Sequence, residues 1–197
     1  IANDLYKMFH VLFGGLKGGL AIGTMFMMVA ISAMNGLSVA GMAIGATIAL
    51  PEMLKRNYDK RMITGVVQAG SSLGILIPPS VVMVLYGMIA RQPVSKLWMA
   101  GILPGLLMAS LFLIYIYVRC KLQPELGPPL KKEERNVSTV EKIRLLKAGI
   151  IPFLIFFFMT GLFLMGIASL VECSAVGAFL ATLAAIYKKR FNRKVLE

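Results

Sequence analysis

Residues 18–51 read GGLAIGTMFMMVAISAMNGLSVAGMAIGATIALP, and no charged residue lies between Lys17 and Glu52. A single helix of these 34 residues would be about 51 Å long at about 1.5 Å per residue, against a bilayer hydrocarbon core of about 30 Å. Two complete spans would need about 40 apolar residues and a turn. We therefore predict a re-entrant hairpin over 18–51, whose two short helices enter and leave the membrane by the same face.

The middle of this stretch is polar and contains a glycine, because residues 32–38 read SAMNGLS. Irregular backbone at membrane depth persists only where protein or water satisfies its amides and carbonyls. Half-helices that meet inside the membrane are typical of secondary transporters. We expect the hairpin tip at this polar break.

The composition excludes an ordinary soluble protein: 58% of the residues are hydrophobic, 15% are charged, and the mean hydropathy is +0.79. The formal charge of +12 does not indicate nucleic-acid binding, because the Lys and Arg residues lie in short clusters between apolar stretches. Cys120 and Cys173 form neither a disulfide framework nor a metal-ligand spacing. We expect a protein of the lipid bilayer that binds no nucleic acid.

Charged clusters and prolines divide the chain into eight segments. These are an amphipathic arm helix over 1–17, the hairpin over 18–51, a cytoplasmic loop over 52–61, a broken transmembrane helix over 62–90, a transmembrane helix over 91–118, a cytoplasmic linker over 119–147, two transmembrane helices over 148–187 and a basic cytoplasmic tail over 188–197. The segment 62–90 must break because proline removes a helical hydrogen bond, and it contains Pro78 and Pro79 as well as Gly70-Ser71-Ser72.

The distribution of positive charge supports the hairpin independently of its length. The segments 52–61, 119–147 and 188–197 together hold 17 of the 21 Lys and Arg residues. The positive-inside rule places these segments in the cytoplasm. Lys7 and Lys17 join them on that face only if residues 18–51 return to the side from which they enter.

Three motifs resemble the large membrane subunit of tripartite ATP-independent periplasmic (TRAP) transporters. They are residues 70–80 (GSSLGILIPPS), residues 86–87 (YG) and residues 97–105 (LWMAGILPG). Residues 18–21 and 35–40 are similar to the first hairpin of that family and its entry. Family subunits are about twice as long as this chain, so the resemblance covers roughly their first half.

The chain departs from the family pattern at two places. Residues 166–178 (GIASLVECSAVGA) resemble a segment that usually reads Thr-Pro-Thr-Glu before small residues, and here only the acid, Glu172, is kept. At the hairpin tip, Asn35 and Leu37 stand where small hydroxyl residues are usual.

The resemblance implies an all-α polytopic membrane protein with an ion-transporter-like elevator fold, of which this chain would supply one inverted repeat. It implies a sodium-coupled permease for small organic anions of the C4-dicarboxylate or sialic-acid type in a bacterial or archaeal inner membrane. The implied partners are a small membrane subunit, a periplasmic solute-binding protein and the C-terminal half of the large subunit.

Sodium prefers oxygen ligands, and broken membrane helices offer free carbonyl groups. We therefore predict one sodium site where the two polar breaks meet, formed by Asn35, Gly36, Ser38, Gly70, Ser71 and Ser72. We expect the substrate near Asn35, Ser72, Pro78 and Pro79. We expect no catalytic residue, organic cofactor or transition-metal site.

Each of these features has another interpretation. Gly70, Ser71 and Ser72 can serve close helix packing, and Asn35 can bond a partner helix. Glu172 fits a solvated helix start or a buried role equally well. Trp98 lies near a span end, where an aromatic belt is expected.

Other functional classes also stay open. A channel or passive pore subunit would use broken helices too, and the chain could be an inactive half-length fragment. A membrane enzyme is not favoured, because His10 and Glu172 do not make up a nucleophile and base.

Overall fold

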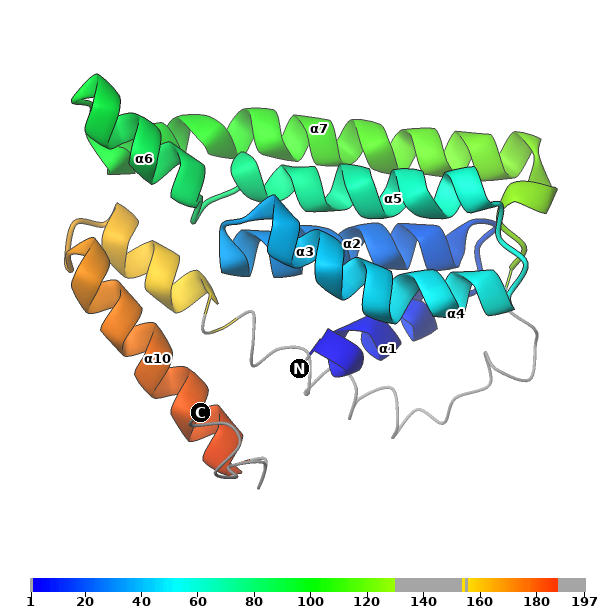
Figure 1. Ribbon diagram of the computed structural model, residues 1–197, viewed down its shortest axis with the longest axis horizontal. Coiled ribbons are helices and arrows are strands. Elements are labelled where there is room, and N and C mark those ends of the chain that lie inside the picture. The colour runs from blue at the N-terminus through cyan, green and yellow to red at the C-terminus, as the bar shows by residue number, and fades with distance from the viewer. Residues whose placement is uncertain (1, 130–153, 155, 188–197) are drawn as a thin grey trace. The chain divides into compact units, whose positions relative to one another are not determined.

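The computed structural model describes residues 2–129, 154 and 156–187 (Figure 1), and these residues form helices and turns without a strand. The all-α class predicted from the sequence is therefore confirmed for this part of the chain. The protein divides into two compact units, Ile1–Gly149 and Ile150–Glu197. Most of the predicted linker over 119–147, the first residues of 148–187 and the basic tail lie outside the described residues.

The first unit begins with an amphipathic helix that packs on its neighbour. In α1 (Ala2–Phe13) the Phe9 ring stacks on Phe26 of α2 (Gly19–Asn35) at 5.6 Å between centroids. A Cβ on Gly23 would lie 3.0 Å from the carbonyl oxygen of Phe9, so glycine permits the close approach of the two backbones.

Residues 19–55 form a helical hairpin. The second arm of this hairpin consists of α3 (Ser38–Ile44), a π-helical segment (Gly45–Ala49) and α4 (Leu50–Lys55). It packs antiparallel to α2 (Figure 1). The helical arm continues four residues beyond the predicted boundary at 51, and Pro51 lies at the start of α4, which follows directly on the π-helical segment within this arm.

The next helix ends in an irregular segment. Asp59 caps α5 (Lys60–Ser72) by accepting hydrogen bonds from the N–H groups of Arg61 and Met62 at 2.9 and 3.1 Å. A 3₁₀ turn (Leu73–Ile75) follows, and the chain stays non-helical over 76–80. The helix thus persists through Gly70-Ser71-Ser72 and breaks only before the prolines.

Two apolar helices complete this unit, α6 (Val81–Ala90) and α7 (Val94–Leu122). Among the described residues α7 alone has the length and hydropathy to cross a membrane by itself, while α2, α6 and Leu170–Leu183 are shorter apolar helices. The 29 residues of α7 extend about 44 Å at about 1.5 Å per residue, which is longer than a hydrocarbon core of about 30 Å.

The core of the first unit is centred on α2, which contacts α1, α5 and the second arm of the hairpin. Met25, Met27 and Met28 are 1%, 0% and 0% exposed. Unbranched methionine side chains fill irregular gaps, so this run forms packing between helices.

The second unit contains a helix over 156–164, a turn over 165–169 and α10 (Leu170–Tyr187). Ser169 and Glu172 form a capping box at the start of α10. The Glu172 carboxylate accepts hydrogen bonds from the Ser169 N–H at 2.7 Å and the Ser169 hydroxyl at 2.8 Å, and the Glu172 N–H donates back to that hydroxyl at 3.3 Å. Of the two interpretations of Glu172, the structure therefore shows the exposed helix start.

Candidate functional site

The tip of the hairpin meets the break between α5 and α6. The main-chain N–H of Val81 donates to the carbonyl oxygen of Gly36 at 3.2 Å. Gly36 has φ +65°, and a Cβ there would lie 2.8 Å from the carbonyl oxygen of Pro79. Glycine is required at this position for both reasons, since other residues disfavour the left-handed conformation and would collide with Pro79. Gly36 and Pro79, both predicted site residues, thus lie together.

The opposite side of the break rests on α7. The indole N–H of Trp98 donates to the carbonyl oxygen of Ser80 at 3.3 Å, and Trp98 is only 4% exposed. A Cβ on Gly101 would lie 2.6 Å from the carbonyl oxygen of Leu76. The motif over 97–105 therefore supports the irregular segment. The expectation that Trp98 belongs to an aromatic belt is wrong, because the side chain is buried and its indole N–H donates to the carbonyl of Ser80, which also accepts the Val84 N–H.

The break provides backbone oxygen atoms. Because Pro78 and Pro79 have no N–H group, they cannot donate to the carbonyls of Gly74 and Ile75 as helical residues would. The Ser80 hydroxyl accepts a hydrogen bond from the Met83 N–H at 3.3 Å and caps α6. The prolines thus end one helix, and Ser80 starts the next.

A layer of small residues lies one helical turn below the tip. A Cβ on Gly41 would collide with the Ser32 hydroxyl and lie 3.4 Å from Cβ of Ser71, and a Cβ on Gly74 would lie 2.7 Å from Cβ of Ser32. Ser32 and Ser71 are fully buried. The Ser71 hydroxyl donates to the carbonyl of Gln68 at 3.0 Å, whereas the Ser32 hydroxyl has no hydrogen-bond partner within the described part of the chain.

Sequence reasoning missed Ser32 as a site residue, although it lies in the polar stretch at the tip. Serine is common in apolar helices, and its spacing along α2 carries no special signal. Only the packing of Gly41 and Gly74 against it shows that its hydroxyl is enclosed.

Three of the predicted sodium ligands are partly or fully accessible at the surface. The Asn35 amide donates to the carbonyl of Ile31 at 2.9 Å, so it bonds its own helix. Ser38 is half-buried in the first turn of α3, and Ser72 is exposed with its hydroxyl donating to the carbonyl of Ala69 at 2.8 Å.

The remaining predicted ligand lies away from the tip. A Cβ on Gly70 would lie 2.5 Å from Cβ of Met28 and 3.2 Å from the sulfur of Met25. Gly70 therefore permits α5 to pack closely on α2, as in the packing interpretation. Gly36 and Pro79 meet at the tip, Ser71 lies in the layer below, and Gly70 belongs to the helix interface.

The site has no charged side chain of its own, because the stretches 18–51 and 62–90 are uncharged. The nearest charged groups of the hairpin lie at its open end, where an Arg56 guanidinium nitrogen is 2.8 Å from Oε1 of Glu52. This hydrogen bond lowers the pKa of Glu52 below its ordinary value. A cation at the tip would therefore be held by neutral oxygen atoms.

The whole chain, residues 1–197, matches the family described as the tripartite ATP-independent periplasmic transporter, DctM component. A C4-dicarboxylate TRAP transporter large permease protein of Pseudomonas aeruginosa is 29% identical over 193 residues, which cover 98% of this chain and 44% of that protein. A 2,3-diketo-L-gulonate TRAP transporter large permease protein of Escherichia coli K12 is 30% identical over 183 residues, 90% of this chain and 41% of that protein.

Shorter matches include relatives with other substrates in their names. An isethionate TRAP transporter permease protein of Oleidesulfovibrio alaskensis is 31% identical over 139 residues, 71% of this chain and 21% of that protein. An ectoine TRAP transporter large permease protein of Halomonas elongata is 33% identical over 117 residues, 59% of this chain and 27% of that protein. The chain spans less than half the length of these relatives.

Proposed function

Because the chain belongs to the DctM component family of tripartite ATP-independent periplasmic transporters, we propose that it supplies the first half of a large permease subunit that couples sodium entry to the uptake of small organic anions. The protein is a permease component and no enzyme. Its location is the inner membrane of a bacterium or archaeon, and its fold is one inverted repeat of an elevator-type transporter.

The observation that carries this proposal is the contact between Gly36 and the Pro79–Val81 backbone. It joins two irregular segments, one between α2 and α3 and the other between α5 and α6. Such junctions provide carbonyl oxygens for a cation and helix N-termini for an anion. Here α3 begins at Ser38 and α6 begins at Val81, so two helix N-termini lie at the same junction.

We propose that sodium binds at this junction, with ligands from Asn35, Gly36, Ser38, Gly70, Ser71 and Ser72. The position of Ser71 in the layer of small residues below the tip supports its inclusion among the sodium ligands. The contact of Gly70 with Met28 favours a packing role for Gly70. Neutral oxygen ligands suit a hard monovalent cation. The substrate would lie on the accessible side of the tip near Asn35, Ser72, Pro78 and Pro79.

The relatives named above act on C4-dicarboxylate, 2,3-diketo-L-gulonate, isethionate and ectoine. Ectoine is a zwitterion with a carboxylate and the other three are anions, so these names support small organic acids as a class and no individual compound. The proposed partners are a small membrane subunit, a periplasmic solute-binding protein and the remaining half of the large subunit, all within a lipid bilayer.

The test is uptake of labelled substrate by proteoliposomes that contain the complete large subunit, its small subunit and the binding protein. We expect uptake to require a sodium gradient. Ser71→Ala should raise the sodium concentration for half-maximal uptake by about fivefold or more, since a lost ligand contributes roughly 1 kcal/mol or more. Met27→Leu is the matched control, because it changes a buried residue of α2 while conserving volume.

Two results would contradict the proposal. An unchanged sodium dependence in both Ser71→Ala and Ser72→Ala would remove these ligands from the site. Equilibration of substrate without sodium and without the binding protein would identify a passive pore instead.

A further inference from the structure

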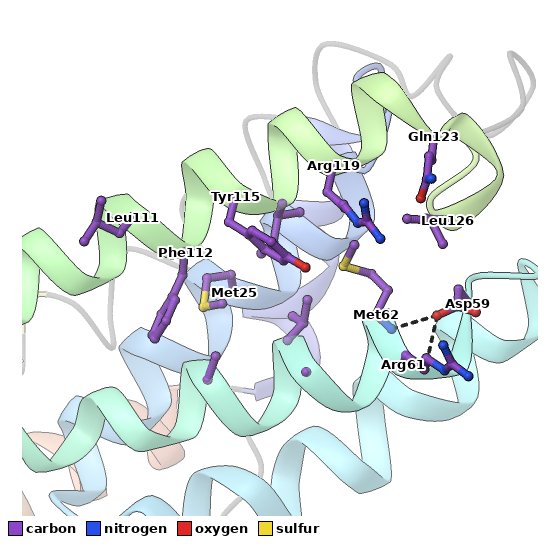
Figure 2. Close-up of a pocket in the computed structure, with 14 residues that line it drawn as sticks. Met25, Asp59, Arg61, Met62, Leu111, Phe112, Tyr115, Arg119, Gln123 and Leu126 are labelled. Carbon is purple, nitrogen blue, oxygen red and sulfur yellow. Dashed lines mark hydrogen bonds between the residues drawn. The ribbon is translucent and has the colours of Figure 1, made fainter.

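A cavity of about 760 Å³ lies between α5 and α7, with Met25 of α2 in its wall. Figure 2 shows that its lining changes along its length. Arg61, Arg119 and Gln123 lie toward one end, and Leu111 and Phe112 lie toward the other. The cavity is therefore polar and cationic at one end and apolar at the other.

The polar end is held together by the backbone. The N–H of Asp59 donates to the carbonyl of Leu126 at 3.3 Å, which ties the start of α5 to the segment that follows α7. This contact brings Arg61, near the start of α5, to the same end of the cavity as Arg119, in the last turn of α7. Both arginines thus lie at the same end of the helix pair α5 and α7.

No ion pair within the described part of the chain compensates the positive charge at this end. The carboxylate of Asp59 caps α5 by accepting hydrogen bonds from the main-chain N–H groups of Arg61 and Met62. Neither guanidinium group, of Arg61 or of Arg119, has an ion-pair partner among the residues that the structure describes. Arginine forks pair well with phosphate oxygens, so this end of the cavity suits an anion.

The apolar end of the cavity indicates which kind of anion fits it. Phe112 lies two turns before Arg119, which is about 10 Å toward the middle of α7 at about 1.5 Å per residue. A soluble phosphate would leave the surface around Leu111 and Phe112 uncovered, and a purely apolar ligand would leave the guanidinium groups unpaired. An amphiphile with an anionic head and an acyl chain matches both ends of the cavity.

We propose that this cavity binds one anionic phospholipid, with its phosphate on Arg61 and Arg119 and one acyl chain along Leu111 and Phe112. The lipid comes from the leaflet next to the loop at 52–61, which is the cytoplasmic leaflet in the proposed topology. Bound there, it links α5 to α7 and stabilises the arrangement of these helices.

A larger side chain in place of Gly65 would fill part of the cavity without a collision. Gly65 lines the cavity, and a Cβ on it would have no atom within 4 Å. Gly65→Leu should occupy the space of the acyl chain. It should raise the melting temperature of the lipid-depleted protein, because leucine favours a helix more than glycine does. It should also abolish lipid retention.

The test uses the complete permease purified in detergent, with native mass spectrometry to count retained lipid and thermal unfolding to measure stabilisation. We expect one tightly retained phosphatidylglycerol and a rise in melting temperature when phosphatidylglycerol is added. The double variant Arg61→Gln/Arg119→Gln should weaken retention by about tenfold or more, since hydrogen bonds to charged groups are strong. Arg91→Gln, an exposed arginine outside the cavity, should have no effect.

Four results would overturn the proposal. They are equal stabilisation by phosphatidylcholine, equal stabilisation by inorganic phosphate, unchanged retention in the double arginine variant, and absence of retained lipid in the unmodified permease. The last result would mean that the rest of the subunit fills the cavity. The sodium dependence of uptake is measured separately, so these outcomes do not depend on the sodium site.

Discussion

The carbonyl oxygen of Gly36 accepts a hydrogen bond of 3.2 Å from the main-chain N–H of Val81, which joins the hairpin tip to the start of α6. Both partners are backbone atoms, so the contact does not depend on the identity of a side chain beyond the need for glycine. Trp98 fixes the same segment from the other side through the carbonyl of Ser80. The tip and the break are therefore positioned by a backbone hydrogen bond on one side and an indole hydrogen bond on the other.

Replacement of Gly36 by Ala should destabilise the complete subunit by about 2 kcal/mol or more. The left-handed conformation costs about 1–2 kcal/mol for a residue with a Cβ, and that Cβ would lie 2.8 Å from the carbonyl oxygen of Pro79. Thermal unfolding in detergent measures the effect. Gly65→Ala is the control and should be neutral or stabilising, because its Cβ meets no atom within 4 Å. Equal stability of the two variants would refute the steric requirement at Gly36.

Replacement of Ser32 by Ala should stabilise the subunit by about 1 kcal/mol in sodium-free buffer. The variant removes a buried hydroxyl without a hydrogen-bond partner, and such a group costs about 1–3 kcal/mol. Ser110→Ala is the control, since the exposed Ser110 hydroxyl already bonds the carbonyl of Leu106. A loss of stability in Ser32→Ala would show that the hydroxyl has a partner in the complete protein.

Replacement of Trp98 by Phe should destabilise the subunit by about 1–3 kcal/mol. The variant leaves the carbonyl of Ser80 without the indole donor and creates a small cavity beside the break. Tyr86→Phe, at an exposed position of α6, should change the unfolding temperature little. If both variants unfold alike, the indole hydrogen bond does not support the break.

Cysteine labelling should place Lys17 and Lys55 on the same, cytoplasmic face of the membrane and Gln92 on the opposite face. All three positions are exposed in the structure, and the arrangement follows from a hairpin that re-enters the membrane. The background should carry Cys120→Ala and Cys173→Ala, because both native thiols are free. Labelling of Lys17→Cys and Lys55→Cys from opposite faces would exclude the re-entrant hairpin.

The 197 residues by themselves should neither transport nor stay monodisperse in detergent. An alternating-access carrier needs two halves around its site, and backbone groups left without partners in lipid cost several kcal/mol each. Co-expression with the remaining half of a full-length relative should restore both properties. Size-exclusion chromatography and uptake assays measure them. Robust sodium-driven uptake by the 197-residue chain would show that copies of it complete one another.

The roles of some residues in and around the predicted site can be recognised in the sequence, and those of others cannot. Pro78, Pro79 and Gly36 act through the backbone, by a missing N–H or a left-handed φ, and these properties can be recognised in the sequence. The placement of Gly70 against Met28 and the burial of Trp98 could not be recognised there. In an apolar helix the face toward lipid and the face toward protein are equally hydrophobic, so the hydropathy pattern does not reveal which residues meet.

The sequence by itself determined the helical membrane class, the polar stretch at Asn35 and Gly36 and the proline break. Charge, hydropathy and the backbone limits of glycine and proline are local properties, and they act whatever the chain packs against. Only the tertiary structure decided that Ser32 is enclosed by Gly41 and Gly74, and that Arg61 and Arg119 lie at one end of a shared cavity. These pairs come from different segments of the chain, and the packing of whole helices alone brings them together.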